Sequence, residues 1–349
     1  MAAGIETFAG PLARIGRTEL LYPDTGVLPG GAEQQVAKPL ELSLQVFNPD
    51  ITGFNAQTIR EARENQVMQG KVILALGAGP KGMAGAAARE LILQGAFVVV
   101  SSRMTDSGEP KSSGMREFLE KLGPNAQWMG SDVAAWISVT NDRGKKVEMY
   151  DGQRLVRQVA KERGRLDGLI VGSGDMQNTW SYKKVEPEKV REILLKDAEG
   201  PMFAAITAAE IMQSQNPAGG KIAGIGSASG IGNAFQIEYS MAKGAFHAGI
   251  RALADELNIL NQRALEKGRP PHNIEVNAIA PGLVDTPLVA GLSPEVRAGI
   301  VTKMGADREL DAGEPGAMLA YLMGPYSDGI TGQVIPMFGR GEIPTWLAA

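Results

Sequence analysis

The chain has 349 residues, of which 44% are hydrophobic and 21% are charged, a composition typical of folded globular proteins rather than disordered, fibrous or coiled-coil ones. It contains no cysteine and two histidines, which excludes disulfides, thiolate metal sites and cysteine nucleophiles, and we expect no metal site. The formal net charge of −4 lacks the positive excess that a dedicated nucleic-acid-binding protein carries. These numbers favour small-molecule chemistry.

The apolar runs of the sequence are short. Phe97–Val100 is strand-sized, far below the ~20 residues that cross a bilayer, so we expect no membrane span. Residues 1–16 lack a basic segment followed by an apolar core, the pattern of a secretory signal. The expected location is therefore cytoplasmic.

Residues 1–70 differ in texture from the rest of the chain. Prolines punctuate positions 11 to 49, and a charged stretch around Thr58–Met68 is predicted to be helical. Because such a segment buries little core, we interpret residues 1–70 as an irregular N-terminal extension that serves as a surface wrap or oligomer arm.

From Lys71 onward, short apolar runs alternate with amphipathic stretches. This rhythm predicts one α/β domain over 71–349, a doubly wound parallel sheet with helices on both faces. Insertions are expected near 104–127 and 134–150, and a mobile substrate lid near 286–311. Strands are expected at 71–76, 97–101, 168–172, 221–226, 273–278 and 333–336, and helices at 82–94, 114–122, 188–213, 239–265 and 313–323.

A glycine-rich turn follows the first expected strand. Gly77, Gly79 and Gly82 form G-x-G-x-x-G between that strand and a helix, the context in which a Rossmann-like domain binds a dinucleotide pyrophosphate at the helix N-terminus. The alternative is a flexible glycine loop without a ligand. We expect a dinucleotide cofactor here.

The end of the second strand predicts which dinucleotide binds. An acidic side chain there would hold the ribose 2′-hydroxyl of NAD(H), but the sequence offers Ser102 and Arg103, which suit a 2′-phosphate. NADP(H) is therefore preferred over NAD(H), the alternative being that Arg103 is an ordinary surface residue. Asp132 and Val133 follow the expected third strand, where Asp132 either accepts from the adenine amino group or caps the next element.

A serine, a tyrosine and a lysine follow the strand near residue 225. Ser227 stands at the strand end, and Tyr239 and Lys243 are four apart on one helix face, so the ammonium can stand beside the phenol. Lowering a phenol pKa from near 10 to about 7 requires roughly 4 kcal/mol, which a neighbouring cation and an oxidised nicotinamide could supply together. These three residues are the catalytic candidates.

With this constellation, residues 71–339 resemble the short-chain dehydrogenase/reductase family. The segments Val276–Pro287 and Gly329–Val334 reinforce the resemblance. It implies Tyr239 as general acid, Lys243 as the residue that holds the nicotinamide ribose and lowers the tyrosine pKa, and Ser227, with Ser229 as its rival, as the residue that binds the carbonyl oxygen. The cofactor-binding positions it implies, besides those above, are Gly172, Pro281, Gly282, Thr286, Tyr239 and Lys243.

The sequence departs from the family pattern at three places. The glycine loop is longer and carries Pro80-Lys81, Val171-Gly172-Ser173-Gly174 replaces Asn-Asn-Ala-Gly, and Asp197 occupies the helix position that often holds a proton-relay asparagine. The long loop is similar to that of the enoyl-reductase branch, which spaces its tyrosine and lysine more widely. His247, i+4 from Lys243, is interpreted as a packing or surface residue rather than a site residue.

The resemblance implies an NADP(H)-dependent reductase that transfers hydride between the nicotinamide and a carbonyl or secondary alcohol, with Tyr239 as general acid or base. An enoyl-thioester reductase is one alternative, and a catalytically idle NADP-binding protein is another. The expected partners are a small carbonyl or alcohol substrate and further copies of the chain, in a homodimer or homotetramer.

Overall fold

The computed structural model describes residues 54–141, 143–175 and 181–339. Within them, seven parallel strands form one sheet in the order β11-β8-β7-β6-β1-β2-β3. The expectation for residues 1–53 lies outside the described residues. The strands are β1 (Val72–Leu76), β2 (Phe97–Ser102), β3 (Ala126–Gly130), β6 (Gly168–Val171), β7 (Gly220–Ile225), β8 (Ile274–Pro281) and β11 (Val334–Met337).

The strand order reverses between β1 and β6. The chain runs from β1 outward to β3 and then returns to place β6 on the other side of β1, pairing Leu76 with both Ser101 and Val171. A parallel sheet binds ligands where its order reverses, outside the carboxyl ends of the strands. The predicted doubly wound parallel sheet is confirmed, and it places the glycine turn after β1 at this point.

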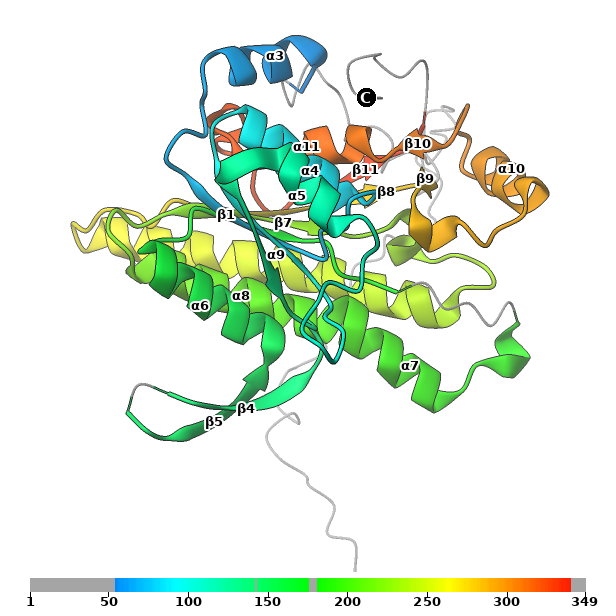
Figure 1. Cartoon of the computed structure of the whole chain (residues 1–349), viewed down its shortest axis with the longest axis horizontal. Coiled ribbons are helices and arrows are strands. Elements are labelled where there is room, and N and C mark those ends of the chain that lie inside the picture. The colour runs from blue at the N-terminus through cyan, green and yellow to red at the C-terminus, as the bar shows by residue number, and fades with distance from the viewer. Residues whose placement is uncertain (1–53, 142, 176–180, 340–349) are drawn as a thin grey trace, which may run out of the picture. The chain divides into compact units, whose positions relative to one another are not determined.

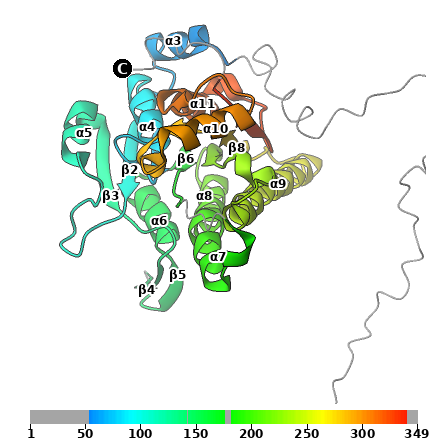
Figure 2. The ribbon, with the colours of Figure 1, turned by 90° about the vertical axis from the view of Figure 1, so that its right-hand side faces the viewer.

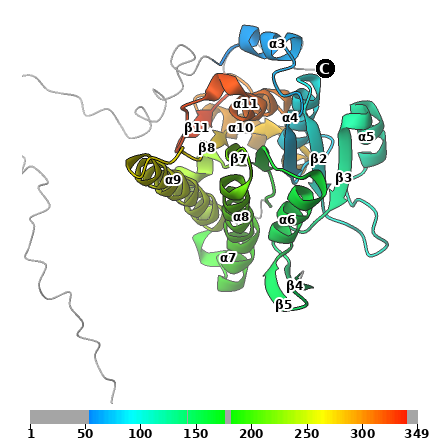
Figure 3. The same cartoon turned by 90° about the vertical axis from the view of Figure 1, so that its left-hand side faces the viewer.

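The sheet is buried on both faces, which is why its strands read as apolar runs. All five residues of β1 are buried. On one face lie α4 (Met83–Leu93), α5 (Met115–Leu122) and α11 (Gly313–Met323); on the other lie α6 (Asp151–Arg163), α8 (Gly200–Ser214) and α9 (Ile237–Glu266) (Figures 1, 2 and 3). Small residues let α4 and α11 approach closely, since a Cβ on Gly316 would lie 2.6 Å from the Ala86 Cβ.

The predicted helix around Thr58–Met68 is present as α3 (Ala56–Glu64), which begins after Asn55, whose side chain accepts from the Thr58 amide. Ile59, Ala62 and Met68 are buried. Ile59 and Met68 belong to the core cluster that includes α4 and α11. The described part of the predicted extension therefore packs against the α/β domain.

The expected helix over 188–213 is divided in the structure. It consists of α7 (Pro187–Leu194), a five-residue π-helix η4 (Leu195–Glu199) and α8. π-Helical turns are rare and frequently occur at functional sites. Asp197 lies in this turn.

The expected insertion at 134–150 is a hairpin. β4 (Trp136–Thr140) and β5 (Lys146–Tyr150) pair antiparallel, apart from the main sheet, and project away from it (Figure 1). Segment 286–311 contains η6 (Pro287–Val289), α10 (Pro294–Lys303) and β10 (Leu310–Asp311), which pairs with β9 (Val284–Asp285). Among the helices of the described ranges, none has the length and apolarity to cross a membrane.

Candidate active site

The turn between β1 and α4 depends on glycines. Gly77 has φ +69°, and a Cβ there would lie 2.7 Å from the Ser173 backbone nitrogen. A Cβ on Gly85 would lie 2.1 Å from the Gly79 carbonyl oxygen. No side chain caps α4 at Gly82, so the amides of its first turn are open to a ligand.

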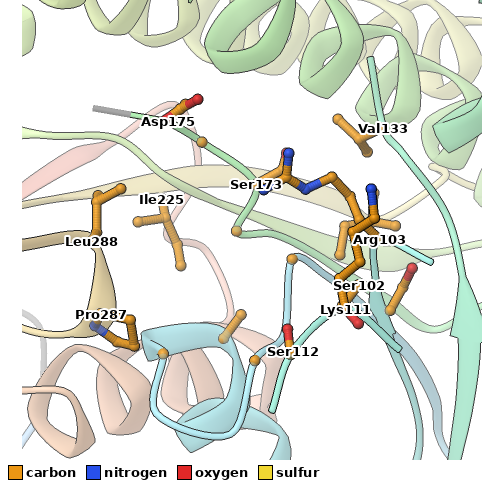
Figure 4. Close-up of a pocket in the computed structure, with 18 of the residues that line it drawn as sticks. Ser102, Arg103, Lys111, Ser112, Val133, Ser173, Asp175, Ile225, Pro287 and Leu288 are labelled. Carbon is orange, nitrogen blue, oxygen red and sulfur yellow. The ribbon is translucent and has the colours of Figure 1, made fainter. Parts of the chain in front are cut away.

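A pocket of about 520 Å³ opens over this turn. It extends from the ends of β2 and β3 to the segment after β9. Figure 4 shows Ser102, Arg103 and Lys111 grouped at one end and Pro287 and Leu288 at the other. The pocket therefore has a basic end and an apolar end.

At the basic end of the pocket lie Ser102, the last residue of β2, and Arg103, which follows it. Neither side chain is acidic. Ser102 is buried, and its hydroxyl accepts from Trp128 Nε1 at 3.1 Å. Arg103 forms no ion pair with any described residue, and its carbonyl accepts from the Lys111 amide at 2.9 Å, which brings Lys111 beside it. Lys111 and the neighbouring Ser112 line the pocket, although no motif in the sequence indicated them.

Asp132 and Val133 also line the pocket. Asp132 Oδ1 accepts from the Ala134 amide at 3.3 Å, while the Asp132 amide donates to Asp151 Oδ2 at 2.9 Å. Asp132 thus stabilises its own turn while it lines the pocket, so both roles that the sequence left open stay predictions.

The pocket contains polar groups that suit a bound dinucleotide. The buried hydroxyls of Ser131 and Ser173 have no hydrogen-bond partner among the described residues, and both residues line the pocket. Because a buried hydroxyl without a partner is costly, these groups are prepared for ligand contacts. Together with the glycine turn, they fit a dinucleotide.

Four further predicted cofactor positions divide into two pairs. Gly172 and Thr286 line the pocket. Pro281 and Gly282 do not, and the Gly282 amide donates to the Met337 carbonyl at 2.7 Å, next to the β8–β11 pairing. The structure therefore gives Gly282 a backbone role beside β11.

The three catalytic candidates lie together beyond the apolar end. Tyr239 and Lys243 are buried on one face of α9, with Lys243 Nζ 5.7 Å from the Tyr239 ring centroid. The Ser227 hydroxyl lies beside the Tyr239 phenol, where it acts to lower the pKa of Tyr239. None of the three lines the pocket itself, but Ile225, which does, accepts from Lys243 Nζ at 3.2 Å. The reacting groups therefore adjoin the pocket.

Ser229, the rival of Ser227, is engaged elsewhere. It is buried, and its hydroxyl donates to Gln236 Oε1 at 2.8 Å. The Ser227 hydroxyl also accepts from the Ser229 amide at 3.1 Å, which fixes it at the start of the turn. The geometry favours Ser227 for contact with a substrate oxygen.

Comparisons with known proteins agree with this architecture. A family model described as enoyl-(acyl carrier protein) reductase matches residues 77–339. The chain belongs to the short-chain dehydrogenase/reductase family. A short-chain reductase protein of Streptomyces niveus is 27% identical, over 79% of this chain and 95% of its own. A 3-oxoacyl-[acyl-carrier-protein] reductase of Salmonella typhimurium is 24% identical, over 78% and 97%.

A solved structure supports the same assignment. A crystal structure of a putative short-chain alcohol dehydrogenase from Sinorhizobium meliloti has a TM-score of 0.63 and 26% identity, over 79% of this chain and 97% of the other. The chain is accordingly an oxidoreductase of the short-chain dehydrogenase/reductase family, which uses a nicotinamide cofactor.

The lysine of this site faces a carboxylate. Asp197 Oδ2 lies 3.4 Å from Lys243 Nζ, and both side chains are buried. Asp197 Oδ1 accepts from the Asp175 amide at 2.7 Å. The sequence identified Asp197 as a departure, but its partner 46 positions away becomes visible only in the folded chain.

Burial dominates the protonation of the phenol. It raises the pKa of Tyr239, and the carboxylate of Asp197 raises it further; the Lys243 ammonium and the Ser227 hydroxyl favour the phenolate but do not outweigh burial. The sequence predicts that Lys243 and an oxidised nicotinamide together lower the pKa of Tyr239. In the protein alone, the phenol stays protonated at neutral pH.

His247 is both a packing residue and a neighbour of the site. It is buried, and a Cβ on Gly226 would lie 2.1 Å from its Nε2. Nε2 accepts from the Ser227 amide at 3.3 Å. Burial, with the nearby charges of Lys243 and Arg251, lowers the pKa of His247 to about 4, so the ring is neutral near pH 7 and can accept this bond.

Proposed function

We propose that the chain is an NADP(H)-dependent reductase of carbonyl compounds, in which Tyr239 donates the proton to the carbonyl oxygen. The observation that carries this proposal is the adjacency of the Ser227 hydroxyl, the Tyr239 phenol and the Lys243 ammonium beyond the apolar end of the dinucleotide pocket. A bound nicotinamide would supply the hydride.

The residues of the chain supply the remaining chemistry. The Ser227 hydroxyl would donate to the substrate oxygen and orient the carbonyl. The Tyr239 phenol would protonate that oxygen as negative charge develops on it. Lys243, held by the Ile225 carbonyl, would stabilise the resulting phenolate.

The preference for NADP(H) rests on the basic end of the pocket. Arg103 and Lys111 line the pocket beside the end of β2, and neither Ser102, the last residue of β2, nor Arg103 after it is acidic. A guanidinium fork binds phosphate oxygens in pairs.

An enoyl-thioester reductase is the second candidate, and the matching family model, described as enoyl-(acyl carrier protein) reductase, favours it. The four-residue spacing of Tyr239 and Lys243 and the relatives described as 3-oxoacyl reductases support carbonyl reduction instead. Turnover of a 3-oxoacyl thioester in preference to the matching 2,3-unsaturated thioester is the expected result.

The proposal is tested with Tyr239→Phe. This change removes the proton donor but keeps the ring, so NADPH consumption with a carbonyl panel should fall by at least about a hundredfold. NADPH affinity, measured by cofactor fluorescence, should change by less than about threefold, because the phenol lies outside the pocket lining.

Tyr326→Phe is the matched control, since Tyr326 is 40% exposed and lies in η7 (Pro325–Ser327), which contributes no residue to the pocket lining. It should keep full activity. Undiminished turnover by Tyr239→Phe contradicts the proposed mechanism, and tight NADPH binding by the unaltered protein without turnover of any carbonyl favours an idle NADP-binding protein.

A further inference from the structure

Asp197 is a buried acid whose carboxylate has one backbone hydrogen bond and one charged neighbour. Its side chain has no solvent exposure, and Oδ1 accepts one backbone hydrogen bond, from the Asp175 amide. Oδ2 lies 3.4 Å from Lys243 Nζ and has no other polar partner among the described residues. Because an uncompensated buried carboxylate is costly, the Lys243 ammonium is the charge that makes this position tolerable.

The same contact constrains Lys243. Its ammonium is 4% exposed, donates to the Ile225 carbonyl and faces Asp197. Gly174 also lies against the ammonium, since a Cβ at this position would be 3.2 Å from Lys243 Nζ and 3.3 Å from Asp197 Oδ2. A side chain at 174 would crowd the ion pair, so the glycine keeps it intact.

The ion pair changes the electrostatics beside Tyr239. A lysine alone contributes one positive charge next to the phenol, whereas in the pair Asp197 offsets part of that charge, although the effect of Lys243 on the pKa of Tyr239 stays the larger of the two. Asp197 raises the pKa of Lys243 by favouring the ammonium, and it raises the pKa of Tyr239 by disfavouring the phenolate. An asparagine in its place would leave the cation uncompensated.

The other charged groups around this pair balance one another. Asp175 lies 3.2 Å from Lys196 Nζ, and Lys196 also pairs with Glu192 at 2.7 Å. On α9, His247 faces Lys243 and Arg251 and is neutral near pH 7. Buried Glu238 also lies on α9, next to Tyr239 in the chain. Asp197 is the acid in direct contact with the lysine.

We propose that Asp197 is a positioning residue that fixes the Lys243 ammonium and offsets part of its charge, which keeps the Tyr239 phenol protonated and ready to donate at neutral pH. This inference rests on the proposed role of Tyr239. In the reduction, the carbonyl carbon gains the hydride of NADPH and its oxygen gains the phenol proton, which leaves NADP⁺ and a phenolate. The reverse reaction starts from the phenolate, so its rate should rise with pH as Tyr239 ionises.

The test follows the ionisation of Tyr239 directly. Phenolate absorbance at 295 nm is titrated for the full chain and for Asp197→Asn, and the Tyr239→Phe form of each is subtracted to isolate this one tyrosine. Asp197→Asn should lower the pH at which Tyr239 ionises by about one to two units, the effect of removing one nearby like charge. The amide keeps the size of the side chain and can still accept from Asp175.

Glu192→Gln is the matched control, because it removes the same charge from a side chain that is 44% exposed. It should leave the titration of Tyr239 within a few tenths of a pH unit. Circular dichroism over the same pH range confirms folding, and Asp197→Ser replaces Asp197→Asn if the amide variant does not fold. A Tyr239 titration that is the same with and without the Asp197 carboxylate overturns the proposal.

A kinetic measurement separates this inference from the proposed function. With 3-hydroxybutyryl thioester and NADP⁺ as probes, the pH at which the oxidation rate rises should fall in Asp197→Asn by as much as the titration of Tyr239 does. An oxidation pH profile that stays in place despite a shifted titration overturns the inferred effect on catalysis. Full turnover by Tyr239→Phe refutes the proposed function instead, and the titration remains interpretable without any turnover.

Discussion

Gly85→Ala tests whether the glycine turn positions the cofactor. The new Cβ would lie 2.1 Å from the Gly79 carbonyl oxygen and 3.0 Å from its carbon, so that peptide or α4 must move by about 1 Å to reach ordinary contact. The same oxygen accepts from the Gly82 amide at 3.0 Å, and a shift of Gly79 therefore displaces the whole turn.

The energies set the expected size of the effect. Alanine gains about 1 kcal/mol of helix propensity over glycine, while overpacking costs about 1–3 kcal/mol, so the free energy of unfolding should change little or fall by up to about 2 kcal/mol. Losing one or two charge-assisted hydrogen bonds to the pyrophosphate costs about 1.5–3 kcal/mol each, which weakens NADPH binding by at least about tenfold.

Gly299→Ala provides the matched control for this prediction. Gly299 is also helical, in α10, but a Cβ there has no neighbour within 4 Å. This variant should gain up to about 1 kcal/mol of stability and bind NADPH as the unaltered protein does. Fluorescence titration with NADPH and thermal melts measure both variants. Wild-type affinity in Gly85→Ala would refute the reasoning.

Three further predictions concern charge and hydrogen bonding. Arg103→Glu should shift preference from NADPH toward NADH by at least about tenfold in kcat/KM, whereas exposed Arg143→Glu should not; equal effects would contradict a 2′-phosphate site. The pKa of His247 is about 4 in the folded chain, whereas an unfolded histidine protonates near pH 6.5. The free energy of unfolding, measured with urea, should therefore fall by about 2 kcal/mol as the pH is lowered from 7 to 5. His247→Gln should lack this loss, and an equal loss would contradict it. Lys303 Nζ donates to Asn233 Oδ1 at 2.6 Å, so Lys303→Ala should speed amide hydrogen exchange in α10 without changing NADPH affinity. Unchanged exchange would contradict a stabilising role of this hydrogen bond for α10.

The fold and the local geometry of the site could be predicted because they depend on short-range patterns. Parallel strands covered on both faces are apolar throughout, as β1 is, and the alternation with helices gave the sheet. Gly77 and its neighbours follow β1 directly. Tyr239 and Lys243 share a face of α9 because they are four residues apart.

Contacts between distant segments could not be predicted in this way. The π-helical turn at Leu195–Glu199 has no sequence signature, yet it carries Asp197, whose carboxylate faces Lys243. Lys111 joins Arg103 because the loop after β2 folds back on itself. Such pairings are set by tertiary packing, which periodicity along the chain does not encode.

The helix α9 links the catalytic groups to the sheet through one stripe of side chains. Tyr239, Lys243 and His247 are spaced four apart, so they lie on one face of the helix. They contact, in order, the Ser227 hydroxyl, the Ile225 carbonyl and the Ser227 amide, all within three residues at the end of β7. Because every contact joins the same two elements, a small rotation of α9 would disturb the proton donor, the ammonium and the serine together. Gly226 and Gly230, which accommodate the His247 ring, therefore bear on the proposed proton donor as well as on packing.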